Sequence, residues 1–170
     1  SIYDNKSLKK FYKFLLFIKN KNIKIYFDFN VRINNWSNKS IALKSIIKFS
    51  QIADIIFMTK EDLLALGLKD PKKIINKYYK SSLVIFRSGK GKIVIHNENN
   101  LESYNFKFLK KVKDTTGCGD AFNACFIYNY FYQNKIKDCL KVAHRLGKTV
   151  AQSKGAIINK KNFNIQSYAI

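Results

Sequence analysis

Residues 114–120 read Asp-Thr-Thr-Gly-Cys-Gly-Asp, and they lead directly into the apolar run AFNACFIYNYFY at 121–132. Two glycines two positions apart, at the entrance to a predicted helix, let the backbone turn tightly and present several N–H groups together. Such a nest at a helix N-terminus attracts anions, because the aligned peptide dipoles add positive potential. Asp120 lies in the first helical turn, where its carboxylate either caps the helix or accepts a proton from a bound hydroxyl group. The residues alone leave both interpretations open.

On both sides of this stretch, short apolar runs alternate with helical periodicities. Helices are predicted over residues 8–19, 37–50, 59–66, 71–80, 121–132 and 136–153, and strands over 23–29, 53–58, 82–87, 92–96 and 104–106. Ser37 and Thr59 are the predicted N-caps of two of these helices, and His96 is predicted to be a surface residue of its strand. Strands that alternate with helices indicate βαβ units. We therefore expect an α/β fold with a mainly parallel central sheet covered by helices on both faces.

Composition favours a folded chain of one domain. The 170 residues are 46% hydrophobic, which is too apolar for a disordered chain despite a net charge of +21. That charge invites a nucleic-acid interpretation, but 29 of the 32 basic residues are Lys and only three are Arg. Arg is the better residue for bidentate contacts to bases and phosphates, and a bias toward A/T-rich codons explains abundant Lys, Ile and Asn. We therefore expect no specific nucleic-acid partner.

The cysteines and the apolar runs bear on location. Cys118, Cys125 and Cys139 show neither CxxC spacing nor a companion His cluster, so we expect free thiols in a reducing cytoplasm. No apolar run approaches the roughly 18 residues that a membrane-spanning helix needs, so no membrane partner is expected.

The stretch DTTGCGDAFNACF at 114–126 resembles the C-terminal signature of the ribokinase-like (PfkB) carbohydrate kinases, whose usual form is DTTGAGDxFxAGF. Cys118 replaces the usual Ala, a small-for-small change at a position where the backbone N–H matters. Four further segments match the family in the right order. They are FDFNVR at 27–32 with Trp36, which is similar to D-x-N-x-R…W of 2-keto-3-deoxygluconate kinases and fructokinases; ADI at 53–55 with TKED at 59–62 and Leu66; the strand and turn at 83–91; and the last helix with Gly155-Ala156.

The resemblance implies a ribokinase-like three-layer α/β/α fold and ATP-dependent phosphorylation of a sugar hydroxyl, on a substrate of the 2-keto-3-deoxygluconate or fructose type. Asp120 would be the general base and would contact the sugar together with Arg32. The amides of Gly117, Cys118 and Gly119 would form the anion hole, and Mg²⁺ would accompany the nucleotide. Nucleotide-binding roles are implied for Asn30, Arg32, Thr59, Arg87, Ser88, Gly89, Gly91 and His144.

Several of these implied roles have structural alternatives. Asp114 matches a position that binds a monovalent cation such as K⁺ in some relatives, and Asp62 one that reaches Mg²⁺ through water. Helix capping is the alternative for Thr59 and Asp62, and packing between helices is the alternative for His144. In the turn at 87–91 Ser88 displaces or replaces the family's first glycine, which affects the expected nucleotide contacts.

Relatives are markedly longer than this chain, and their N-terminal half supplies the first strands of the sheet, a lid and most sugar contacts. We therefore expect residues 1–170 to be the C-terminal, nucleotide-binding and catalytic-base part of a PfkB kinase domain, without sugar phosphorylation by itself. Three alternatives stay open: a fragment of a working kinase, the relic of a decaying gene, and a basic binding module. The expected partners are a sugar and ATP, and the resemblance also allows a homodimer of the full-length parent.

Overall fold

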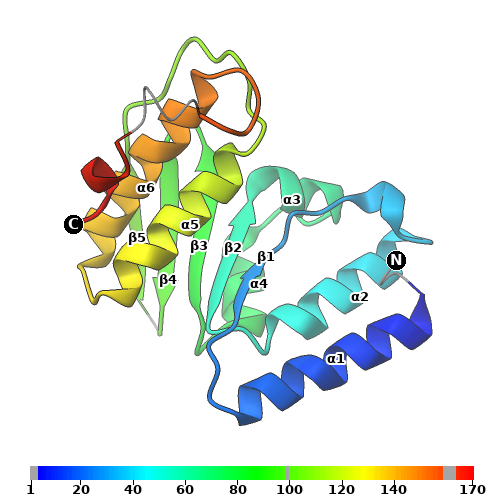
Figure 1. The fold of residues 1–170 in the computed structure, drawn as a ribbon. Coiled ribbons are helices and arrows are strands. Elements are labelled where there is room, and N and C mark those ends of the chain that lie inside the picture. Colours follow the sequence, from blue (N-terminus) through cyan, green and yellow to red (C-terminus); the bar gives the residue numbers. More distant parts are fainter. Residues whose placement is uncertain (1–3, 99, 159–163) are drawn as a thin grey trace. The chain divides into compact units, whose positions relative to one another are not determined.

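The computed structural model describes residues 4–98, 100–158 and 164–170, which form two compact units that meet in sequence between Ser103 and Tyr104. The first unit holds α1 to α4 and most of the sheet, and the second holds α5, α6 and a C-terminal 3-10 turn (Figure 1).

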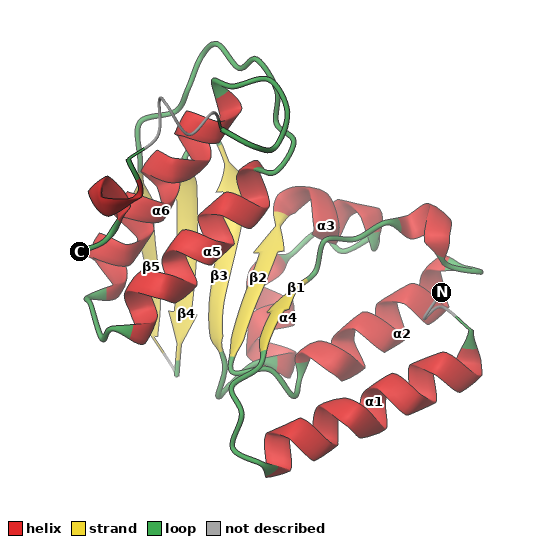
Figure 2. Ribbon diagram, in the orientation of Figure 1, coloured by secondary structure: helices red, strands yellow, loops and turns green. Residues whose placement is uncertain are grey.

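A five-stranded sheet runs in the order β1-β2-β3-β4-β5. The strands are β1 Tyr26–Asp28, β2 Ile55–Thr59, β3 Leu83–Gly89, β4 Lys92–Asn97 and β5 Asn100–Asn105 (Figure 2). The first three pair in parallel, with Phe27 opposite Ile56 and Ile56 opposite Val84, whereas β4 is antiparallel to β3. The sheet is therefore mixed, because helices connect β1 to β2 to β3 while a tight turn at Gly89–Gly91 connects β3 to β4.

Four helices belong to the first unit: α1 Asn5–Asn20, α2 Lys39–Ser50, α3 Lys60–Ala65 and α4 Pro71–Tyr78. Each follows a side-chain cap, as predicted for Thr59. The prediction of Ser37 as the cap of α2 was wrong by one residue, since Asn38 accepts the Ile41 N–H at 2.9 Å. A single 3-10 turn, η1 Ile33–Asn35, precedes α2.

The core of the first unit lies between these helices and one face of the sheet. Phe11 of α1 meets Phe49 of α2 edge to face, with ring centroids 5.5 Å apart. Fully buried Tyr79 and Ser50 share a hydrogen bond of 2.7 Å between their hydroxyl groups. Burial also corrects the prediction for His96, which is 5% exposed and lies inside the fold. The short alternating strand that carries it was too weak a pattern to identify its buried face.

The second unit contains α5 Cys118–Phe131, α6 Ile136–Ala151 and the turn η3 Ile165–Tyr168. Gly147 lets α6 approach α5 closely, because a Cβ added there would lie 3.3 Å from the Cys118 carbonyl oxygen. Fully buried Asn129 holds the C-terminal segment: its side chain donates to the Tyr168 carbonyl at 2.8 Å and accepts from the Ile170 N–H at 2.9 Å. The predicted strand at 104–106 is the end of β5, which stops at Asn105, and the predicted helix 136–153 ends at Ala151.

Candidate functional site

Asp114 organises the turn that leads into α5. One of its carboxylate oxygens accepts hydrogen bonds from the Thr116 N–H at 2.9 Å and from the Thr116 hydroxyl at 2.7 Å. The other oxygen accepts from the Gly155 N–H at 2.9 Å, which lies beyond the end of α6. The hydroxyl and N–H of Thr116, followed by the Gly155 N–H, lower the pKa of Asp114. The carboxylate is therefore ionised at neutral pH and ties the start of α5 to the end of α6.

Gly117 is the N-cap of α5 and has a left-handed backbone, with φ of 75°. A Cβ at this position would lie 2.7 Å from the Ala156 Cβ and 3.0 Å from its Cα. Real Cβ atoms do not approach so closely, so both the backbone conformation and the neighbour require glycine. Ala156 therefore packs directly against Gly117.

The first amides of α5 point out of its N-terminus. The Ala121 N–H makes the first helical hydrogen bond, to the Gly117 carbonyl at 2.9 Å, so the amides before it have no partner within the helix. Among them, the Cys118 N–H donates to the Thr115 carbonyl at 3.2 Å. Asp120 is exposed in this first turn. The predicted anion-hole residues and the predicted base are thus held together at one helix end.

His144, predicted to bind nucleotide, lies on α6 and packs within the second unit. Its ring stacks on Phe106 with centroids 5.1 Å apart, and its Nε2 lies 3.2 Å from the Lys107 carbonyl oxygen. Burial lowers the pKa of His144, and the charge of Lys148 acts in the same direction. These contacts match the packing alternative, and the nucleotide role stays a prediction.

Acid is expected to destabilise the chain through His144. Because its folded pKa lies below the unfolded value of about 6.5, the unfolded chain takes up a proton that the folded chain does not, and stability falls as the pH drops below that value. His144→Phe keeps the stacked ring but cannot ionise, so its thermal midpoint should fall less between about pH 7 and about pH 5 than that of the unmodified chain. Equal slopes in the two proteins would contradict the assignment.

In the first unit, Asn30 and Arg32 follow β1, Thr59 is the last residue of β2, and Asp62 lies in the first turn of α3. Asn30 has a left-handed φ of 37°, which is uncommon for a residue with a side chain. The Arg32 guanidinium donates to the Val31 carbonyl at 3.2 Å and is otherwise exposed. A cavity of about 240 Å³ opens beside this segment; its lining comprises Phe11, Phe27, Asp28, Phe29, Asn30, Val31, Arg32, Trp36, Ile46 and Phe49.

Asp62 joins the segment after β1 to the start of α3. One carboxylate oxygen accepts from the Val31 N–H at 2.8 Å, and the other accepts from the Thr59 N–H at 2.9 Å and the Thr59 hydroxyl at 2.7 Å. The Thr59 hydroxyl in turn accepts from the Asp62 N–H at 3.1 Å, which completes a capping box. Asp62 is 6% exposed, and these contacts match its capping alternative. Its role toward Mg²⁺ stays a prediction.

Asp62→Ala should lower the free energy of unfolding by about 2–3 kcal/mol, because it leaves the half-buried N–H groups of Val31 and Thr59 without their acceptor and removes half of the capping box. The neighbouring Glu61 is exposed in the same helical turn and provides the control. Glu61→Ala should change stability by about 0.5 kcal/mol or less in urea unfolding. Similar losses for the two variants would show that Asp62 acts only through the helix dipole.

The β3–β4 hairpin carries the remaining predicted nucleotide residues, Arg87, Ser88, Gly89 and Gly91. Ser88 is an extra residue between Arg87, which pairs with Ile93, and Gly89, which pairs with Lys92, so it forms a bulge. Three consecutive residues from Gly89 to Gly91 have positive φ values of 89°, 51° and 79°. This explains the unusual Ser-Gly-Lys-Gly spacing: the bulge places Ser88 in the strand, and the glycines make the turn.

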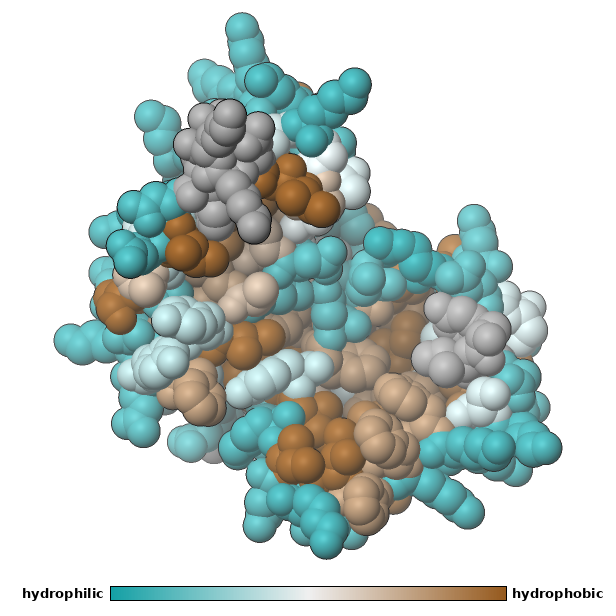
Figure 3. Space-filling model, in the orientation of Figure 1, coloured by the Kyte–Doolittle hydropathy of each residue, from teal (hydrophilic) through white to brown (hydrophobic). Residues whose placement is uncertain are grey.

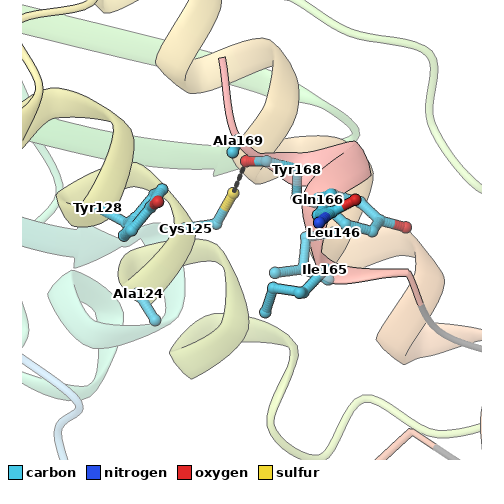
Figure 4. A pocket seen from close by; sticks show the side chains of 8 residues that line it. All are labelled: Ala124, Cys125, Tyr128, Leu146, Ile165, Gln166, Tyr168 and Ala169. Atoms are coloured by element: carbon cyan, nitrogen blue, oxygen red, sulfur yellow. Dashed lines mark hydrogen bonds between the residues drawn. The ribbon is translucent and has the colours of Figure 1, made fainter. Parts of the chain in front are cut away.

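The second unit contains a separate apolar cavity of about 400 Å³ between α5, α6 and the C-terminal segment (Figure 4). Its lining comprises Ala124, Cys125, Tyr128, Leu146, Ile165, Gln166, Tyr168 and Ala169. Cys125 points its sulfur toward the Tyr168 carbonyl oxygen at 3.7 Å, and burial raises the pKa of this thiol. Sequence reasoning missed this cavity, because the segment that closes it carries no regular apolar pattern.

Cys118, Cys125 and Cys139 are thiols that form no disulfide, as predicted. Within the described residues, no group of three or more His, Cys, Asp or Glu side chains is placed to hold a metal ion. None of the helices in the described part of the chain has the length and apolar character needed to cross a membrane.

Residues 5–162 match the family model described as pfkB family carbohydrate kinase. The 2-dehydro-3-deoxygluconokinase of Haemophilus influenzae is 30% identical over 146 residues, which cover 82% of this chain and 46% of that protein. The chain thus spans about half the length of the curated relatives that it matches.

Solved structures agree on the fold. A fructokinase double mutant from Vibrio cholerae O395, with fructose, ADP and a potassium ion bound, has a TM-score of 0.78 at 23% identity, covering 91% of this chain and 53% of that one. An Escherichia coli protein solved with ATP and Mg²⁺ has a TM-score of 0.76 at 18% identity, covering 92% and 51%. The chain therefore has a ribokinase-like α/β fold with a mixed sheet.

Proposed function

Because the chain belongs to the pfkB family of carbohydrate kinases, we propose that it provides the nucleotide-binding and phosphoryl-transfer part of an ATP-dependent sugar kinase. The observation that carries this proposal is the turn at Gly117. Ala156 packs against Gly117, and the turn leads into α5 with the first backbone amides pointing outward. The exposed carboxylate of Asp120 lies in the first turn of this helix.

This helix end fits a transferring phosphoryl group. Backbone N–H groups at a helix N-terminus, together with the helix dipole, stabilise phosphate oxygens without side-chain charge. The amides of Gly119 and Asp120 are the main candidates for these contacts, with those of Gly117 and Cys118 beside them. Because the Cys118 amide already donates to Thr115 within the turn, its contribution requires that this bond be shared or exchanged.

Bound ATP supplies the γ-phosphoryl group. The Asp120 carboxylate orients the sugar hydroxyl and accepts its proton as the hydroxyl oxygen bonds to phosphorus, while the amides of α5 stabilise the charge that develops on the phosphoryl oxygens. ADP leaves with the electron pair of the broken P–O bond. Asp114 keeps the turn in place during this step through its bonds to Thr116 and Gly155.

Arg32, Asn30, Arg87 and the β3–β4 turn are proposed to contact the sugar or the nucleotide. Arg32 is exposed beside the aromatic cavity after β1, where a guanidinium suits a carboxylate or phosphate oxygen. This favours a keto-deoxy acid sugar, the type named for the Haemophilus relative, with fructose as the second candidate. Mg²⁺ is proposed to enter with the nucleotide phosphates, and the ionised Asp114 is proposed to support a K⁺ ion.

The test uses two proteins. The chain alone should bind ATP, measured calorimetrically, and should form no ADP with either sugar. A chimera that joins the unmatched portion of the Haemophilus kinase ahead of this chain should form ADP with 2-dehydro-3-deoxygluconate, and the fructose assay ranks the second candidate. A folded chimera that binds ATP but forms no ADP with either sugar would show that the proposed activity is wrong.

A further inference from the structure

Phosphoryl transfer at the start of α5 does not use the apolar cavity of about 400 Å³ between α5, α6 and the C-terminal segment (Figure 4). We call it the C-terminal cavity. Two of its lining side chains, Tyr128 and Ile165, are 51% and 69% exposed, so the cavity opens to solvent. Apolar side chains reach the surface over α5 and α6, with hydrophilic ones around them (Figure 3). Small-molecule sites measure roughly 300–1,000 Å³, so the size suits a bound ligand.

The wall that the C-terminal segment contributes is held by hydrogen bonds. The buried Asn129 side chain donates to the Tyr168 carbonyl and accepts from the Ile170 N–H. The Tyr168 hydroxyl lies 2.9 Å from the Thr149 hydroxyl of α6. The cavity is therefore formed before a ligand enters, and a preformed site loses little conformational entropy on binding.

The lining of the C-terminal cavity selects an apolar body for the ligand. None of its eight residues is Asp, Glu, Lys, Arg or His. Cys125 adds no charge at neutral pH, because burial raises the pKa of its thiol, against the smaller opposing effects of the Asn129 side chain and the Arg145 charge. A charged group placed among these side chains would lose its hydration and find no partner. The part of a ligand that enters the cavity is therefore apolar.

Arg145 places a positive charge beside this apolar lining. It precedes the lining residue Leu146 on α6, its guanidinium carbon lies 5.0 Å from the centroid of the Tyr168 ring, and its guanidinium donates to the Ser167 carbonyl. Among the described residues the ion pairs are those of Asp54, so no carboxylate there neutralises Arg145. Arg145 is exposed, and a guanidinium has five N–H donors in a planar fork that suits a carboxylate.

We propose that the C-terminal cavity binds a small amphipathic carboxylate, whose aliphatic tail packs against Ala124, Tyr128 and Leu146 and whose carboxylate binds Arg145. A cationic amphiphile would be repelled by Arg145 and by a chain of net charge +21, and a second copy of the chain would bring the same positive charge. A neutral apolar molecule would leave Arg145 without a counter-charge. Because this ligand takes no part in phosphoryl transfer, its binding does not depend on the proposed function.

The probe is octanoate, and octanol and octyltrimethylammonium are its neutral and cationic matches with the same tail. Calorimetric titration of the 170-residue chain should show one octanoate bound per chain, roughly 10-fold tighter than octanol, which is what a hydrogen bond to a charged group contributes. Octyltrimethylammonium should show no measurable binding. Added salt should narrow the difference between octanoate and octanol, because it screens the exposed guanidinium.

Two variants locate the two ends of the ligand. Arg145→Gln should abolish the preference for octanoate and leave the octanol affinity unchanged. Lys137→Gln is the matched control, since it removes the same charge from α6 roughly 12 Å away along the helix and should keep the preference. Ala124→Leu, at an exposed position of α5, fills part of the cavity and should weaken both octanoate and octanol by roughly 10-fold or more, because the tail buries less apolar area.

Absence of octanoate binding, or equal affinities for octanoate and octanol, overturns the proposal. Equal losses in Arg145→Gln and Lys137→Gln also overturn it, because the carboxylate is then attracted by the net charge of the chain. Unchanged binding by Ala124→Leu puts the tail elsewhere, and a self-dimer that Ala124→Leu abolishes makes a second copy the occupant. Circular dichroism verifies the fold of each variant, and the octanol and salt comparisons on the unmodified chain test the charge even if Arg145→Gln lowers stability.

Discussion

Gly117→Ala is expected to lower the free energy of unfolding by about 2–5 kcal/mol and to abolish ATP binding by this chain. Two costs add. A left-handed backbone costs a residue with a side chain about 1–2 kcal/mol. The new methyl group would also lie 2.7 Å from the Ala156 Cβ, and relieving such overpacking costs about 1–3 kcal/mol. Either the turn opens or Ala156 moves, and in both cases the α5 amides lose their alignment.

Gly155 provides a matched control for this prediction. Its φ of 76° equals that of Gly117 within a degree, but a Cβ there would meet nothing within 4 Å. Gly155→Ala should therefore show only the backbone cost of about 1–2 kcal/mol in urea unfolding. Ala156→Gly added to Gly117→Ala should recover part of the loss, since it removes the nearest atom. Equal destabilisation by Gly117→Ala and Gly155→Ala would mean that the contact with Ala156 has no energetic role.

Local patterns predicted much of this fold. The apolar runs of β2 and β3, the Thr59 cap and the glycine-led start of α5 each depend on neighbours within a few residues, and each lies where the sequence places it. Cap position was less certain, because Ser37 and Asn38 are both good caps and only the folded geometry selects Asn38.

The parts that sequence reasoning missed depend on residues far apart in the chain. The residues near Asp114 do not indicate that its carboxylate accepts a hydrogen bond from the Gly155 N–H, because the two residues are 41 positions apart in the sequence. In the sequence, Gly155-Ala156 is distinguished only by its resemblance to the family, and the contact of Ala156 with Gly117 requires the folded α5–α6 pair. The same holds for Asp62, whose contact with Val31 turns an ordinary cap into a link between two loops. The prediction of His96 as a surface residue is wrong because the sequence of a short strand does not show which of its faces other elements cover.

Asp120→Asn is expected to lower kcat of the chimeric kinase about 10²–10⁴-fold, the usual contribution of a general base, while the ATP dissociation constant changes little. The amide of Asn keeps the size and the polar contacts of Asp120 but cannot take the sugar proton. Loss of kcat with unchanged ATP affinity is the signature of an interaction made in the transition state. ADP formation and calorimetric ATP binding, measured on the same preparation, separate the two quantities.

Asp138→Asn is the control, because Asp138 is the third residue of α6 as Asp120 is the third residue of α5. Both carboxylates interact favourably with a helix dipole, so both substitutions should lower stability by a similar small amount of about 0.3–1 kcal/mol. Only Asp120 stands beside the Gly117 turn, so only its substitution should affect turnover. If Asp120→Asn lowers stability as Asp138→Asn does but keeps near-normal kcat, Asp120 is a helix-capping carboxylate, and the proton of the sugar hydroxyl must go to another group.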